Sequence, residues 1–191
     1  MSVVAGGGEA KGTSYSPALS GDGRSVAFQS GAMNLQAGEA TAYSPLYVYD
    51  RESGKTTCIT LGTDGKPGNG AHFRASLSHE GRFVAFRSYA SNLVRGDSNQ
   101  RLDIFVHNRE SKETRRVTTD LDDECGDPQI SPDGGTVVFW SKASNLVPGD
   151  TNKVSDVFMT DLEEGKIVRV SVGTGGAQSN AASWDCAISG P

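Results

Sequence analysis

Cysteine is scarce in this sequence, and the few cysteines present are not paired. Cys58, Cys125 and Cys186 are far apart and form no CxxC motif. Disulfide frameworks and structural zinc sites normally bring cysteines together in closely spaced pairs. We therefore expect free thiols, with neither a disulfide framework nor a zinc site.

Long apolar runs and an excess of basic residues are also missing. No apolar run approaches the roughly 18 residues that a membrane-spanning helix needs. The opening residues MSVVAGGGEAKG have neither the basic start nor the apolar core of an export signal. A formal net charge of -5 leaves no basic surface to hold a phosphate backbone. We expect no membrane span, no recognisable export signal and no nucleic-acid partner.

Helical periodicity is absent as well, whereas glycine is abundant. The chain has 24 glycines among 191 residues, scattered rather than periodic. This composition is typical of a fold with many tight turns and argues against a helical bundle or collagen. The length fits a single domain or part of one, and we treat residues 1–191 as one all-β repeat domain.

One segment is written three times along the chain. It reads SGDGRSVAFQS from Ser20, SHEGRFVAFRS from Ser78 and SPDGGTVVFWS from Ser131. Blocks downstream of each copy match in the same order, so we place three repeat units at about 13–61, 71–119 and 125–172. Residues 2–20 also resemble residues 171–189, which predicts partial strands at 2–4 and 183–189. The chain is thus expected to start on the last strand of one unit and to stop on the first strand of another.

Each unit is predicted to contain four short strands. The second strand of each is apolar at consecutive positions, as in VAF at 26–28, which indicates a strand covered on both faces. Gly54 and Gly165 occupy equivalent turns before the fourth strand, where the second unit has Lys112. If that turn needs a positive φ, we expect Lys112 to cost about 1 kcal/mol.

The third unit, SPDGGTVVFWSKASNLVPGDTNKVSDVFMTDLEEGKIVRVSV, resembles the PD40 (WD40-like) repeat of TolB-like β-propellers. The resemblance covers nearly the whole chain. It implies four-stranded blades arranged radially, usually six in TolB itself, with the first strand of each blade lining a central channel. The expected fold is all-β: three four-stranded blades, half of a six-bladed TolB-like β-propeller. The relatives are mostly exported, which implies a periplasmic or extracellular location, although the compartment stays open here.

Three blades leave the outer faces of the first and third bare. Because large exposed apolar patches mark interfaces, we expect a homodimer in which two copies close one ring. Alternatives are a segment of a longer repeat protein and an open stack. The spare strand at one end could exchange between subunits or pack outside the ring.

Two long loops carry the same pattern of oxygen ligands. We consider calcium a possible cofactor, since hard cations bind six to eight oxygens. The alternative is that these side chains cap their own turns as Asx motifs. In the first unit the equivalent positions are Glu39, Thr41 and Pro45, so no site is expected there. The candidate ligands are Asp97, Asn99, Asp103, Asp150, Asn152 and Asp156.

Channel-facing candidates come from the predicted first strands. Ser16, Arg74, Asp127 and Asp185 share one register, preceded by Tyr15, Phe73, Gly126 and Trp184. Mixed charge and aromatic rings at a channel mouth suit contact with a peptide or a glycan. The alternative is that these side chains stack between blades. The expected ligand-binding residues are Tyr15, Ser16, Phe73, Arg74, Asp127, Trp184 and Asp185.

No catalytic motif is found in the sequence. It contains no GxSxG elbow and no HExxH motif, and its three histidines all lie in the second unit. We therefore expect no catalytic residues and a non-enzymatic module that binds a protein, peptide or other ligand, as the resemblance to TolB-like proteins implies. One alternative is a hydrolase or lyase that uses channel carboxylates and a loop-bound calcium. Another is a structural or adhesive repeat segment.

Overall fold

The computed structural model describes residues 9–35 and 42–189, and they form an all-β fold. Apart from a short 3-10 turn at Thr174–Gly176, every regular element there is a strand. Within these residues no helix is long and apolar enough to cross a membrane. The strands are β1 (Ser14–Leu19), β2 (Ser25–Ser30), β3 (Leu46–Asp50), β4 (Thr56–Cys58), β5 (His72–Leu77), β6 (Phe83–Ser88), β7 (Asp103–Asn108), β8 (Glu113–Arg116), β9 (Cys125–Ile130), β10 (Thr136–Ser141), β11 (Asp156–Asp161) and β12 (Ile167–Arg169).

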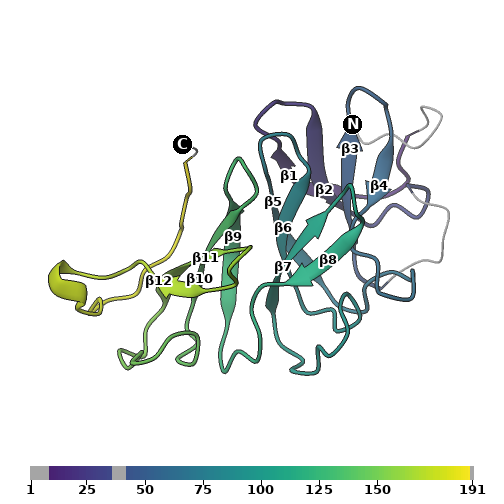
Figure 1. The fold of residues 1–191 in the computed structure, drawn as a ribbon. Coiled ribbons are helices and arrows are strands. Elements are labelled where there is room, and N and C mark those ends of the chain that lie inside the picture. The colour runs from purple at the N-terminus through teal and green to yellow at the C-terminus, as the bar shows by residue number, and fades with distance from the viewer. Residues whose placement is uncertain (1–8, 36–41, 190–191) are drawn as a thin grey trace.

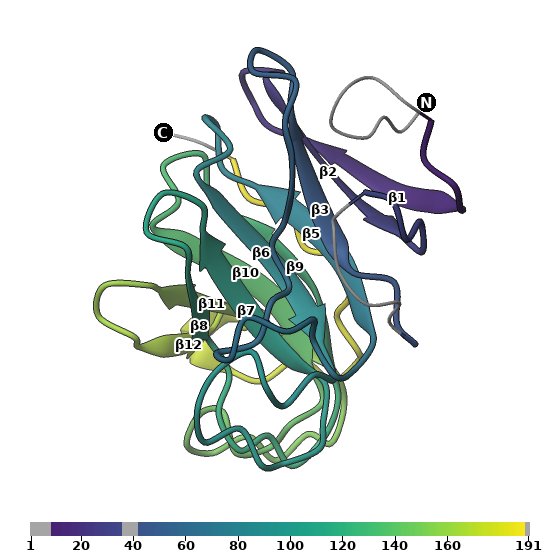
Figure 2. The ribbon, with the colours of Figure 1, turned by 90° about the vertical axis from the view of Figure 1, so that its right-hand side faces the viewer.

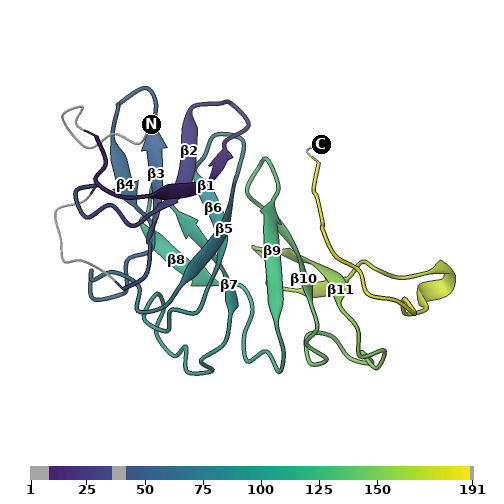
Figure 3. The ribbon, with the colours of Figure 1, turned by 180° about the vertical axis from the view of Figure 1, so that it is seen from behind.

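The strands form three antiparallel sheets of four, each in chain order. The sheets follow one another across the molecule (Figure 1), and from the side the sheets of β5–β8 and β9–β12 lie one behind the other (Figure 2). The first strands, β1, β5 and β9, are neighbours along one side (Figure 3). This arrangement is that of propeller blades around an inner edge, and we call the sheets blade 1, blade 2 and blade 3.

The strands of the blades lie inside the three predicted repeat units. They span residues 14–58, 72–116 and 125–169, so each fourth strand ends three residues before the predicted end of its unit. The predicted partial strand at 2–4 lies outside the described residues. Residues 183–189 are described, but they do not pair with another strand in the described part of the chain.

Each blade has two apolar faces because its second and third strands are apolar at consecutive positions. The aliphatic face of one blade packs on the aromatic face of the next, which builds two buried cores between blades. Aromatic pairs such as Phe86 and Phe105, with ring centroids 5.7 Å apart, occupy the centre of these cores. The aliphatic faces are Ala27, Leu46 and Val48 in blade 1, Ala85, Ile104 and Val106 in blade 2, and Val138, Val157 and Met159 in blade 3. The aromatic faces are Val26, Phe28 and Tyr47 in blade 1, Val84, Phe86 and Phe105 in blade 2, and Val137, Phe139 and Phe158 in blade 3.

The turn before the fourth strand does require left-handed backbone in all three blades. Gly54 and Gly165 have φ of 67° and 69°, and Lys112 has φ of 61° at the equivalent place. A side chain with a Cβ is strained in this region, whereas glycine adopts it freely. The prediction that Lys112 occupies a glycine position is confirmed.

We expect the Lys112→Gly substitution to raise the free energy of unfolding by about 0.5–1 kcal/mol. The gain is the relief of left-handed strain, reduced by the greater backbone freedom of glycine in the unfolded chain. Chemical denaturation measures it. Gly165→Ala, at the matching turn of blade 3, should have the opposite sign, and equal stability of both variants with the wild type would contradict the strain argument.

Candidate functional site

Polar side chains occupy a repeated backbone irregularity on the inner strands. In β1, β5 and β9 the pairing register shifts in mid-strand. Ser16, Arg74 and Asp127 sit in these bulges with φ of 52°, 49° and 48°, and Asp185 has φ of 50° although it belongs to no sheet. Non-glycine residues rarely adopt such values, because Cβ crowds the following carbonyl oxygen. The same strained conformation therefore recurs at four successive positions around the inner edge.

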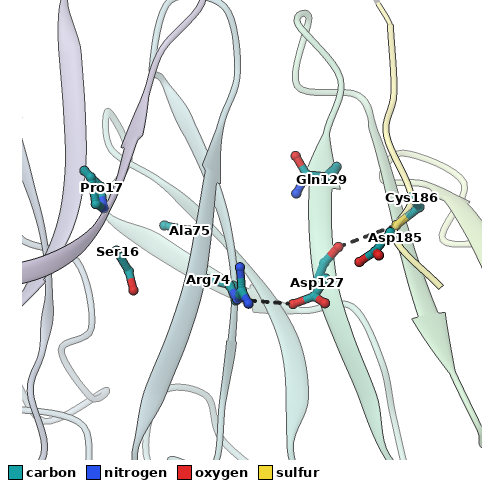
Figure 4. Close-up of a pocket in the computed structure, with 8 residues that line it drawn as sticks. All are labelled: Ser16, Pro17, Arg74, Ala75, Asp127, Gln129, Asp185 and Cys186. Carbon is teal, nitrogen blue, oxygen red and sulfur yellow. Dashed lines mark hydrogen bonds and ion pairs between the residues drawn. The ribbon is translucent and has the colours of Figure 1, made fainter.

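The four bulge residues converge on one cavity of about 320 Å³ (Figure 4). Blades 1, 2 and 3 and the C-terminal segment each contribute to its wall. The structure thus brings together four of the seven side chains that the sequence predicted as ligand-binding. The lining residues are Ser16, Pro17, Arg74, Ala75, Asp127, Gln129, Asp185 and Cys186.

An ion pair crosses the middle of the cavity. The Nε atom of Arg74 lies 3.5 Å from Oδ1 of Asp127 (Figure 4), and the Arg74 side chain is 68% exposed. Trp140 fixes the carboxylate from the other side, because its Nε1 donates a hydrogen bond of 3.1 Å to Oδ2. Oδ1 is buried and accepts no hydrogen bond from the described residues. Asp127 is therefore held rigidly, whereas Arg74 keeps donors that face the open side.

Three predicted ligand-binding residues do not line this cavity. Successive residues of a strand point to opposite faces, so the residue before each bulge faces a neighbouring blade or solvent. The Phe73 ring meets Tyr89 edge-on at 6.3 Å, and the Trp184 ring meets Trp140 edge-on at 4.9 Å. Tyr15 is exposed at the edge of blade 1. The alternative considered from the sequence was stacking between blades. It does not describe Phe73, because Tyr89 directly follows β6 of the same blade, whereas Trp184 of the C-terminal segment stacks on Trp140 of blade 3.

Trp140 of β10 and Arg87 of β6 support the ion pair, and neither was predicted from the sequence as a site residue. The guanidinium of Arg87 lies over the Phe73 ring, 5.5 Å from its centroid, and 4.0 Å from Asp127 Oδ1. Both side chains use space left open by Gly126, where a Cβ would collide with them. Gly126 is the one sign in the sequence that other side chains fill this place, because the three equivalent positions carry an aromatic residue.

The first aspartate-rich loop closes on an arginine. Arg116 of β8 places Nη1 2.8 Å from Oδ1 of Asp97 and 3.6 Å from Oδ2 of Asp103. Asn99 and Thr118 each donate a hydrogen bond to the Asp103 carboxylate, at 2.9 and 2.8 Å. Burial raises the pKa of Asp103, because the charged carboxylate loses its water. The positive charge beside these oxygens is a guanidinium.

The second loop repeats this arrangement in blade 3. Arg169 places Nη1 3.1 Å from Asp150 and 3.3 Å from Asp156. Asn152 donates a hydrogen bond of 2.9 Å to Asp156. Burial likewise raises the pKa of Asp150. All six predicted metal ligands are therefore gathered in two equivalent clusters, each centred on an arginine.

Blade 1 has neither the arginine nor the second aspartate of this cluster. Cys58 pairs with Tyr47 at the position that Arg116 and Arg169 occupy in their blades, and Pro45 replaces the second aspartate. Glu39 and Thr41 lie outside the described residues. Within residues 9–35 and 42–189 no three His, Cys, Asp or Glu side chains are placed to hold a metal ion. The joint loss of arginine and aspartate indicates an ion-pair unit, and calcium binding stays a prediction.

Comparison with known proteins places this geometry in a fold class. No protein-family model matches the chain, and no curated protein gives a significant sequence match. Solved structures do match. TolB from Acinetobacter baumannii is 21% identical with a TM-score of 0.53, over 87% of this chain and 34% of that one. The β-propeller domain of the Trilobed protease from Pyrococcus furiosus is 11% identical with a TM-score of 0.53, over 82% of this chain and 41% of that one.

An enzyme has the same fold. Oligogalacturonate lyase from Vibrio parahaemolyticus is 15% identical with a TM-score of 0.50, over 81% of this chain and 38% of that one. The described residues are thus part of a β-propeller. In particular, they have the TolB-like propeller fold that the PD40 resemblance predicts. The chain spans about a third of the length of the Acinetobacter TolB structure.

Proposed function

We propose that this chain is a non-enzymatic propeller module that binds a peptide segment carrying a carboxylate. The site is the cavity around Arg74 and Asp127. TolB-like binding proteins and a lyase share this fold, so the fold alone does not assign the function. The proposal rests instead on the chemistry of the cavity.

The recurrence of left-handed bulges supports a binding role most strongly. Strained backbone conformations cost on the order of 1–3 kcal/mol each and persist at sites where they position a functional group. Here the strain occurs at Ser16, Arg74, Asp127 and Asp185. All four line one cavity rather than four unrelated places. A stabilising role would not require polar side chains of three kinds, a serine, an arginine and two aspartates, at this position.

The ion pair supplies the recognition chemistry. A guanidinium presents a planar set of donors that matches a carboxylate in a bidentate geometry. The contact between Arg74 and Asp127 is loose, at 3.5 Å, and most of the Arg74 side chain is exposed. The guanidinium can therefore turn from Asp127 to an incoming acidic group. Asp127 Oδ1 is buried beside Arg74, so this turn of Arg74 would have to uncover it before it could accept a hydrogen bond from a backbone N–H of the peptide. Both the charge and the donor of an acidic peptide segment are thereby satisfied.

The test uses two capped peptides, acetyl-Gly-Glu-Gly-amide and its glutamine counterpart. The two tryptophans of the chain, Trp140 and Trp184, adjoin the cavity and report binding by fluorescence, with titration calorimetry as a second readout. We expect the glutamate peptide to bind more tightly than the glutamine peptide. Replacing Arg74 by glutamine should weaken binding of the glutamate peptide about ten- to hundredfold, the worth of a hydrogen bond to a charged group.

The matched control is Arg24→Gln. Arg24 is about half exposed and pairs with Asp50 and Glu52 on blade 1, away from the cavity. Its substitution should leave the affinity unchanged. Equal affinity of the wild type and the Arg74→Gln variant for the glutamate peptide would show that the cavity is not the site.

A further inference from the structure

Residues 183–189 belong to no sheet in the described part of the chain, although one of them shares the left-handed backbone of the inner-strand bulges. Asp185 has the same left-handed φ as the bulge residues of β1, β5 and β9, and it lines the same cavity with Cys186. The segment runs by itself beside blade 3 (Figures 1 and 3). The Ser183 amide donates a hydrogen bond to the Ser155 carbonyl, but no strand in the described part of the chain pairs with the segment. None of the described residues supplies a neighbouring strand for this segment.

This segment is a sequence copy of β1. Residues 178–189 align with residues 9–20 without a gap, so that Ser183 matches Ser14, Trp184 matches Tyr15 and Ile188 matches Leu19. In blade 1 the Ser14 and Ser30 hydroxyl oxygens are 2.9 Å apart across the β1–β2 pair. Residues 183–189 carry the same hydroxyl at Ser183 and the same left-handed backbone at Asp185, and can therefore pair with a β2 strand in the register of β1.

The segment is also fixed to its own blade upstream. Gln178 accepts hydrogen bonds from the Thr151 and Asn152 amides, both at 3.1 Å, and from Arg169 at 3.3 Å. Trp184 packs edge-on against Trp140. By contrast β1 is the most exposed of the inner strands, and Leu19 is 60% exposed. Exchanging β1 for residues 183–189 would therefore cost little buried surface.

The two blade faces on which no other blade packs are of complementary kinds. Within the chain, the aliphatic face of blade 1 packs on the aromatic face of blade 2. The aliphatic face of blade 2 packs in the same way on the aromatic face of blade 3. No blade of the described chain packs on the aliphatic face of blade 3 or on the aromatic face of blade 1. Met159 on the aliphatic face of blade 3 is 36% exposed, whereas Val48 and Val106 at its position in the other blades are buried.

The expectation that both outer faces are bare is wrong for blade 1, because Ala10, Ala32 and Leu35 help to bury Phe28 and Tyr47, which are 8% and 5% exposed. A third interface of the same kind would join these two faces once the residues before β1, which include Ala10, leave the blade 1 face together with β1.

We propose that two copies of this chain join head to tail with exchange of the inner strand. Blade 1 of each copy packs on the free face of blade 3 of the other, and residues 183–189 replace β1 beside β2 of the other copy. Head-to-tail contacts form a ring when the rotation closes. Each copy then supplies β5, β9 and residues 183–189 as inner strands, and Asp185 takes the place of Ser16 in the completed cavity wall.

Disulfide trapping tests the exchange. All variants carry Cys186→Ser, so that the remaining native cysteines, Cys58 and Cys125, are buried. Ser30→Cys protein is mixed with Ser183→Cys protein and oxidised. Because cross-strand neighbours have Cβ atoms about 4.5–5.5 Å apart, exchange brings the two new thiols within reach of each other. We expect a disulfide-linked pair at twice the 20.1 kDa mass of one chain, and none from either variant alone.

The matched control locks β1 in place. Ser14→Cys combined with Ser30→Cys should form a disulfide within one chain, which blocks the exchange. We expect the oxidised protein to have the mass of one chain by light scattering, and the reduced protein twice that mass. A wild-type protein with the mass of one chain at every concentration tested would overturn the proposal. So would a dimer that gives no cross-link between positions 30 and 183. Peptide binding can be measured on the locked protein, so failure of the proposed function is distinguishable.

Discussion

Replacing Arg116 by alanine is expected to lower the free energy of unfolding by about 3–5 kcal/mol, the usual cost of breaking a buried ion pair from one side. The side chains of Asp97 and Asp103 are buried, and Arg116 is the cation that contacts both. Without it, two carboxylates remain in a poorly solvated loop with only neutral donors. Since a domain has about 5–15 kcal/mol of stability, the loss is a large fraction of the total. Guanidinium chloride denaturation measures it.

Two controls separate the buried pair from a general effect of lost charge. Arg82→Ala removes an exposed pair with Glu110 in the same blade and should cost under about 1 kcal/mol. Arg116→Lys keeps the charge but loses the planar fork, and should fall between the two. If Arg116→Ala cost no more than Arg82→Ala, the cluster would not be a stabilising unit.

The free energy of unfolding should fall steeply between pH 6.5 and about pH 4. Burial lowers the pKa of His72 from 6.5 to about 4, and burial together with the nearby Arg109 charge lowers that of His107 to about 4. Above pH 6.5 both imidazoles are neutral in the folded and the unfolded chain, so they add no pH dependence. Below pH 6.5 the unfolded chain takes up protons that the folded chain refuses until about pH 4. Each histidine thus costs on the order of 3 kcal/mol across this window.

The repeats supply the matched variant for this measurement. Ser14 and Thr160 occupy the positions of His72 and His107 in other blades. The double variant His72→Ser with His107→Thr should lose most of the slope between pH 6.5 and 4. Comparing slopes rather than absolute stabilities cancels the buried carboxylates common to both proteins. A slope identical to that of the wild type, in urea denaturation at a series of pH values, would show that these histidines do not control acid stability.

The repeated sequence blocks predicted the blades because their signals are local. Apolar pairs on consecutive positions and glycines at turns depend on neighbours a few residues away, and copies of the same pattern reinforce one another. Comparison between the copies predicted even a single backbone conformation, because the glycines at matching turns indicated the left-handed backbone of Lys112. Strand ends were less well predicted, since the fourth strands stop at Cys58, Arg116 and Arg169.

In the aspartate loops, local sequence patterns did not identify the cation that lies beside the carboxylates. A spacing of oxygen ligands is the same whether a calcium ion or a guanidinium sits among them. Arg116 is distant in sequence from Asp97, and it comes close because β8 pairs with β7 in the register of Phe105 with Arg116. Only cross-strand pairing brings the arginine to the carboxylates, so the sequence pattern, from which we considered calcium ligands or Asx caps, did not predict the ion pairs.

By itself, the sequence determined the repeat, the all-β class and the shared register of the bulge residues, because these follow from periodicity and turn chemistry along the chain. The tertiary structure decided which side chains share a cavity. It turned Arg74 and Asp127 toward each other and Phe73 and Trp184 toward neighbouring side chains. The reason is that a strand sends successive side chains to opposite faces, and packing between blades decides which face is the channel.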